Sequence, residues 1–109
     1  NHSLTFENVL NYLYKETGSI HASFSSKLLA TVNPSMPIWD KFVLKNLGLR
    51  TPYYYEEDRL QKTVQLYQKI CSWYQSEDAV EKLRLFNELF PNTNIPNVKK
   101  VDFILWSTR

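Results

Sequence analysis

The chain has 109 residues and a formal net charge of +2, and 43% of its residues are hydrophobic. That apolar content excludes a disordered chain, and a total of only two glycines argues against an all-β sandwich, which needs many tight turns. The small positive charge excludes a polybasic nucleic-acid tail, although it permits contact with phosphates.

Apolar residues recur every three or four positions through the first half of the chain, which is typical of amphipathic helices. A first helix is predicted over residues 5–17 and ends at Gly18, because a glycine readily takes the conformation that terminates a helix. A second helix is predicted over residues 23–32, before Asn33-Pro34, and a third begins near Pro37 and closes at Gly48. The side chains expected to face the core are Phe6, Val9, Leu10, Leu13, Tyr14, Phe24, Leu28, Leu29, Val32, Ile38, Trp39, Phe42, Val43 and Leu47.

The second half of the chain predicts three further helices after an aromatic linker over residues 51–55. The fourth, over residues 56–75, begins with three acidic residues and has an apolar face broad enough to pack on two sides. Ser76 is expected to cap the fifth, which runs to residue 90 through Val80, Phe86 and Leu89, and the sixth covers residues 97–107. The sequence therefore predicts one all-α domain over residues 1–109, a compact bundle of five to six helices.

Two residues are candidates for a functional pair: Lys27 on the second predicted helix and Asp40 thirteen positions later. Alone, each has an ordinary explanation, because acids favour helix starts and lysines usually stay solvated. Together, an amine and a carboxylate can form and resolve a Schiff base. A functional interpretation therefore requires the two side chains to converge at a cleft.

The stretch around this pair resembles the helix-hairpin-helix DNA glycosylase superfamily. A glycine-bearing hairpin at Gly18 leads into the helix that carries Lys27, and the segment PIWDKFV, residues 37–43, brings in Asp40 at the start of the next helix. The resemblance implies a helix-hairpin-helix-like element near residues 4–47, DNA as partner and, in lyase-competent members, attack of the lysine on the sugar of a flipped nucleotide. It implies that Lys27 and Asp40 are catalytic. The nucleic-acid contacts expected with them are Gly18, His21, Ser23, Ser25, Ser26, Lys41 and Lys45.

Two functions are thus predicted, and whether the protein is an enzyme stays open. The first is a nucleic-acid-contacting domain resembling the catalytic half of these glycosylases, with a role in base excision. The alternative is a non-enzymatic helical interaction module or homodimer, in which Lys27 and Asp40 are scaffold residues. The first requires a basic cleft, whereas the second requires an exposed apolar patch of several hundred Å².

Other residues suggest weaker chemistry. The tyrosines of residues 53–55 could stack on bases or pack over the core or at an interface, and packing is favoured. Asp102, beside Lys99-Lys100, is predicted to lie on a solvated face, and Cys71 to be a buried small hydrophobe. A single cysteine favours a reducing, cytoplasmic setting. No metal motif, no cofactor motif and no apolar run of roughly 20 residues is present, so no metal, cofactor or membrane partner is expected.

Overall fold

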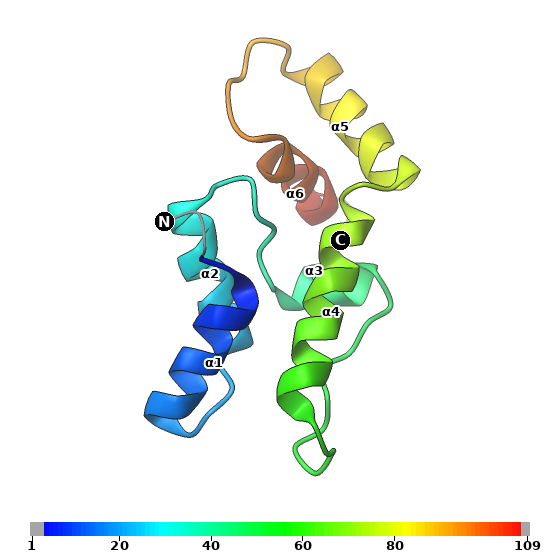
Figure 1. The fold of residues 1–109 in the computed structure, drawn as a ribbon. Coiled ribbons are helices and arrows are strands. Elements are labelled where there is room, and N and C mark those ends of the chain that lie inside the picture. The colour runs from blue at the N-terminus through cyan, green and yellow to red at the C-terminus, as the bar shows by residue number, and fades with distance from the viewer. Residues whose placement is uncertain (1–3, 108–109) are drawn as a thin grey trace.

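The computed structural model describes residues 4–107 and shows six helices and no strand in that range (Figure 1). The helices are α1 (Phe6–Thr17), α2 (Ala22–Val32), α3 (Lys41–Asn46), α4 (Arg59–Trp73), α5 (Glu77–Leu89) and α6 (Asn97–Ser107). The prediction of an all-α bundle of five to six helices is therefore confirmed.

The first two helices form a hairpin around a short turn, residues 18–21, which we call the α1–α2 corner (Figure 1). Thr5 caps α1 by accepting a hydrogen bond from the Asn8 amide at 3.1 Å. Gly18 ends α1 at φ +77°, with its own amide donating to the Tyr14 carbonyl at 2.8 Å. An L side chain is strained in this conformation, so the glycine is what allows the chain to reverse here.

The segment before α3 differs from the prediction, which began this helix near Pro37. Residues 37–40 form no helix, and α3 begins only at Lys41. Two buried hydrogen bonds hold the segment: the Trp39 amide donates to Ser26 Oγ, and the Tyr67 hydroxyl donates to the Pro37 carbonyl, both at 2.7 Å. A helix that began at Pro37 would need the Pro37 carbonyl to accept from an amide one turn later, and the Tyr67 hydroxyl donates to this carbonyl instead, so Pro37 does not lie in a first helical turn.

The core lies between α1, α2, α3 and α4 and also receives Leu105 from α6. The Phe6 ring stacks on the Tyr67 ring at a centroid distance of 4.1 Å and on the Trp39 ring at a longer centroid distance of 6.2 Å. Large rings therefore fill much of a small interior. The buried members of this core are Phe6, Leu10, Ala22, Leu29, Trp39, Val43, Leu44, Tyr67, Ile70 and Leu105.

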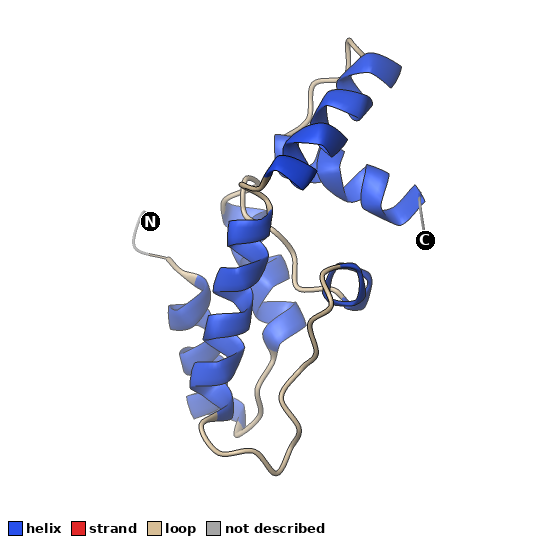
Figure 2. Ribbon diagram, turned by 90° about the vertical axis from the view of Figure 1, so that its right-hand side faces the viewer, coloured by secondary structure: helices blue, strands red, loops and turns tan. Residues whose placement is uncertain are grey.

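The last two helices pack on each other and extend from the α1–α4 body, as Figure 2 shows. Ser76 caps α5 through the Ala79 amide at 3.3 Å, as predicted. Phe86, Phe90 and Phe103 form a cluster of edge and tilted contacts between α5 and α6. α6 also packs against α3, which joins the pair to the body.

Several side chains predicted to be buried are exposed instead. On α2 these are Phe24, Leu28 and Val32, and elsewhere they are Tyr14, Val80, Leu89 and Phe90. α2 buries a different stripe, made largely of Ala22, Ser25, Ser26, Leu29 and Ala30. Small side chains let α2 approach its neighbours closely, which turns its larger apolar stripe toward solvent.

Candidate nucleic-acid interface

Lys27 and Asp40 lie on segments that the fold ties together, but their functional groups do not meet. The Ser26–Trp39 hydrogen bond joins the residues that precede each of them. Lys27 is exposed on α2, whereas the Asp40 carboxylate accepts hydrogen bonds from the Phe42 and Val43 amides at 2.7 and 3.3 Å. Within residues 4–107 no hydrogen bond or ion pair joins Lys27 to Asp40. Asp40 acts as the N-cap of α3, the structural role that an acid at a helix start commonly has.

The residues predicted around the α1–α2 corner fall into two groups. Gly18 and Ser23 are exposed, and the partly exposed His21 contacts Thr17 Oγ1 through Nε2 at 3.1 Å. Ser25 and Ser26, by contrast, are both 0% exposed. Neither of these two hydroxyls can reach a phosphate in this structure, which argues against the predicted contacts of Ser25 and Ser26.

The two lysines predicted on α3 remain available at the surface. Lys41 and Lys45 are both exposed, and neither forms an ion pair within the part of the chain that the structure describes. An exposed, unpaired lysine can contact a phosphate without first losing a protein partner. The exposure of these two lysines is therefore compatible with the predicted phosphate contacts and equally with an ordinary solvated helix face.

A surface hollow of about 360 Å³ connects the α1–α2 corner to the start of α4. Tyr14 and Ile20 line it on the corner side, and Arg59 and its neighbours line it on the other. Lys27 and Asp40 do not line this hollow. The recess nearest the corner is therefore built from residues that the sequence analysis did not single out.

The tyrosines of residues 53–55 do not pack over the core, which is one of the two kinds of packing predicted for them. All three rings are exposed, and packing at an interface with a partner stays a prediction. They follow α3 in a loop at the same end of the molecule as the α1–α2 corner (Figure 1). This loop also explains why α4 starts at Arg59 rather than near residue 56, since the Glu56 side chain accepts a hydrogen bond from the Tyr53 amide within it.

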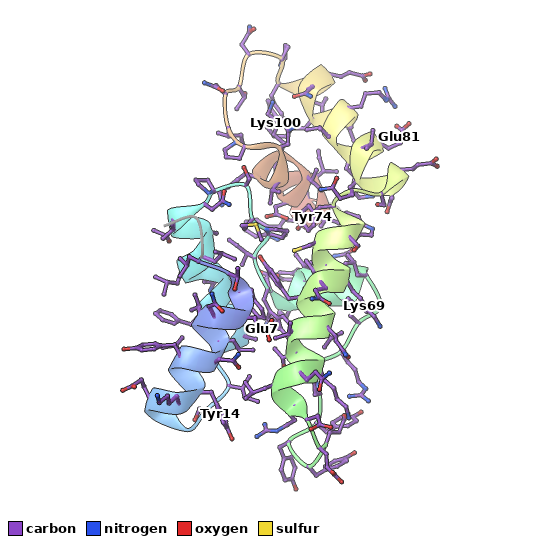
Figure 3. All side chains as sticks on the ribbon, in the orientation of Figure 1. Glu7, Tyr14, Lys69, Tyr74, Glu81 and Lys100 are labelled. Atoms are coloured by element: carbon purple, nitrogen blue, oxygen red, sulfur yellow. The ribbon has the colours of Figure 1, made fainter. Side chains whose placement is uncertain are left out.

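A buried acid that the sequence analysis placed at the surface lies where α4 meets α6. Asp102 is only 6% exposed, and the Tyr74 hydroxyl donates to its Oδ1. Figure 3 shows Tyr74 at the end of α4, next to α6. Burial raises the pKa of Asp102 to about 6; the Tyr74 hydrogen bond and Lys99 oppose this, and the charge of Asp40 adds to it. The neighbouring lysines suggested a solvated face, whereas the flanking apolar residues Val101, Ile104 and Leu105 indicate a buried one.

Comparison with known proteins adds no assignment: no family model, no curated protein and no solved structure matches the chain. Within residues 4–107, no helix is both long enough and apolar enough to cross a membrane. In the same range no three His, Cys, Asp or Glu side chains are grouped so as to hold a metal ion. Burial raises the pKa of the half-buried Cys71 thiol, which disfavours a nucleophilic thiolate.

Proposed function

We propose that this chain is a nucleic-acid-contacting helical domain whose α1–α2 corner contacts the phosphate backbone of a duplex. The observation that carries the proposal is the start of α2. It follows the Gly18 turn directly, and no side chain of the described residues caps it, so the first N–H groups of α2 have no side-chain acceptor in that range. Such a helix start, with its partial positive charge, suits a phosphate oxygen.

Exposed cations on α2 and α3 can add electrostatic attraction to that of the helix start. Lys27 is exposed on α2, and Lys41 and Lys45 are exposed on α3. Asp40 opens α3, the placement that the resemblance to helix-hairpin-helix glycosylases implies for this acid. These features support backbone contact, which depends on positive charge and does not require a catalytic pocket.

The proposal is limited to binding, because the geometry gives Schiff-base chemistry less support. The Asp40 carboxylate is occupied by two amides of α3, and the Lys27 side chain is exposed to solvent. A catalytic pair would need to lie within about one or two hydrogen-bond lengths in a site that shelters a flipped nucleotide. Base excision therefore remains a separate hypothesis with its own test.

We expect the chain to bind a short fluorescein-labelled DNA duplex, with an affinity that falls as salt rises. Lys27→Ala should weaken binding and reduce the slope of log K against log salt concentration by about 1, since one phosphate contact is lost. Arg84→Gln is the matched control, because it removes one positive charge from α5, at the other end of the molecule (Figure 1). Equal effects of the two substitutions would show that net charge, and not the corner, governs binding.

We expect no covalent adduct when the chain is treated with borohydride in the presence of duplex DNA carrying an abasic site. The reason is that no carboxylate of residues 4–107 pairs with the Lys27 amine, and the Asp40 carboxylate is bonded to the amides of α3. Gel electrophoresis under denaturing conditions is the measurement. An adduct that forms with the native chain and vanishes with Lys27→Ala would overturn this expectation and establish lyase chemistry.

A helical interaction module is the second function that a specific observation favours. Phe24, Leu28 and Val32 follow one another at intervals of four along α2 and are all exposed. An exposed apolar stripe of this kind is typical of a contact with another protein surface. If the duplex titration shows no binding and the chain sediments as a dimer that Phe24→Ser separates, this second function replaces the first.

A further inference from the structure

The three exposed tyrosines form an ordered group, which we call the tyrosine platform: Tyr53, Tyr54 and Tyr55. The Tyr53 and Tyr55 rings are stacked, with centroids 5.3 Å apart and planes 14° from parallel. Tyr54 meets Tyr55 edge-on at 5.6 Å. Exposed fractions of 50%, 84% and 69% along the platform leave much of these rings in contact with solvent. Aromatic surface of this extent is rarely left in water without a partner to cover it.

Glu56 fixes the loop that presents the platform. Its carboxylate accepts hydrogen bonds from the Tyr53 amide at 2.8 Å, from Arg50 at 2.9 Å and from Lys62 at 3.0 Å. These donors, the Tyr53 amide foremost, lower the pKa of Glu56 to about 2, so the carboxylate stays charged. The Arg50 guanidinium also lies over the Tyr53 ring, 4.1 Å from its centroid. The rings are therefore held in place before any ligand arrives, which reduces the entropy lost on binding.

A basic hollow of about 330 Å³ adjoins the platform. Arg50, Lys62 and Lys69 line it, against a single carboxylate, that of Glu56. The two Glu56 oxygens pair with Arg50 and Lys62, and Lys69 forms no ion pair in the described part of the chain. Figure 3 shows Lys69 on the side of α4 that faces away from α1. The hollow thus keeps a net positive charge that an anionic ligand can use.

The platform and the α1–α2 corner belong to one continuous surface. Glu56 lines the basic hollow and also the hollow that reaches Tyr14 and Ile20 at the corner. Figures 1 and 2 show the loop before α4 and the corner at the same end of the molecule. A nucleic-acid strand that contacts the α1–α2 corner can therefore continue toward the tyrosine platform along this end of the molecule.

We propose that the tyrosine platform and the basic hollow bind an unpaired nucleotide of a single-stranded nucleic acid. A base stacks on the exposed face of Tyr54 or of Tyr55, whose ring planes are 79° apart, and its phosphate lies among the three cations of the hollow. Both faces of a base inside a duplex are covered by its neighbours, so stacking on the platform selects unpaired bases. The site extends the proposed function from duplex backbone to single strands, and it rests on contacts that do not involve the corner.

The test is a fluorescence-anisotropy titration of a labelled oligothymidine of about 12 nucleotides, a length within the range that single-strand sites cover. We expect Tyr54→Ala and Tyr55→Ala each to weaken binding about tenfold. Lys69→Glu should weaken binding and flatten its dependence on salt. Tyr12→Ala is the matched control, because Tyr12 is an exposed tyrosine on α1 outside the platform.

The outcomes separate this site from the corner and from a protein partner. Circular dichroism of each variant shows whether it is folded, and loss of fold is not expected because the platform rings are exposed. Oligothymidine binding that is absent, or that Tyr54→Ala and Tyr55→Ala leave unchanged, overturns the proposal. Sedimentation as a dimer that these two substitutions dissociate identifies the platform as a protein interface and also overturns it. Lys27→Ala should affect only the duplex titration, so the corner and the platform can fail independently.

Discussion

Replacing Asp102 with asparagine should remove most of the loss of stability that the native chain shows as the pH rises from about 4 to about 7. The native carboxyl is buried, and its pKa is raised from 3.8 to about 6. The folded state therefore holds a proton that the unfolded state releases. The stability that this bound proton contributes is fully present below about pH 4 and is lost as the pH rises through about 6.

The size of this effect follows from the pKa difference. A change of one in pKa corresponds to about 1.4 kcal/mol, so the native chain should lose about 3 kcal/mol of unfolding free energy across this range through Asp102. Asp102→Asn keeps an oxygen that can accept from the Tyr74 hydroxyl, but it has no proton to release. Urea denaturation at intervals of pH measures the difference between the two chains.

The control for this prediction is Asp78→Asn, which removes an exposed carboxylate that pairs with Lys82 on α5. Its pH profile should follow that of the native chain, because exposed ion pairs contribute little to stability. If the unfolding free energy of Asp102→Asn falls with pH as steeply as that of the native chain, Asp102 is either ionised or hydrated in the folded protein. Tyr74 and Lys99 would then stabilise its charge more strongly than the structure indicates.

Replacing Ser26 with alanine should cost about 2 kcal/mol of unfolding free energy, whereas the same change at Ser25 should cost nothing. Both serines are fully buried on α2. Ser26 Oγ accepts from the Trp39 amide at 2.7 Å and donates to the Ser23 carbonyl at 2.9 Å. Its removal leaves a buried amide without an acceptor, and that amide belongs to the segment that positions Asp40.

Ser25 is the matched control, because its hydroxyl is buried and has no hydrogen-bond partner among residues 4–107. Removing an unsatisfied buried hydroxyl relieves a desolvation cost, so Ser25→Ala should leave stability unchanged or raise it by up to about 1 kcal/mol. Chemical denaturation of both variants at one pH measures the contrast. Equal losses would mean that lost side-chain volume, and not the hydrogen bond to Trp39, determines the stability of this region.

The helix boundaries that the sequence predicted well depend on local signals. Gly18 ends α1, Ser76 caps α5, and α6 covers the predicted residues 97–107. Each of these signals acts within about one helical turn, through a backbone conformation or a single hydrogen bond. The start of α3 was predicted wrongly, since the bonds from Ser26 and Tyr67 that keep residues 37–40 out of a helix come from other helices.

The candidate site was harder to predict from the sequence than the fold. Lys27 and Asp40 could be named from their spacing, but the spacing does not reveal that the Asp40 carboxylate is occupied by the amides of α3. The tyrosines of the platform were noticed as a cluster, yet their exposure depends on how Glu56 ties the loop to Arg50 and Lys62. Such contacts depend on side-chain positions that a linear pattern does not contain.

The sequence by itself determined the all-α class, a bundle of five to six helices and the helix ends at Gly18 and Ser76, because periodicity and capping are properties of neighbouring residues. Only the tertiary structure decided which face of each helix is buried. α2 turns Phe24 and Leu28 outward because its small residues pack closely against the rest of the fold. Asp102 is buried because Tyr74 of α4 and the body of the protein cover it. Burial depends on partners far away in the sequence, and those partners are known only once the helices have packed.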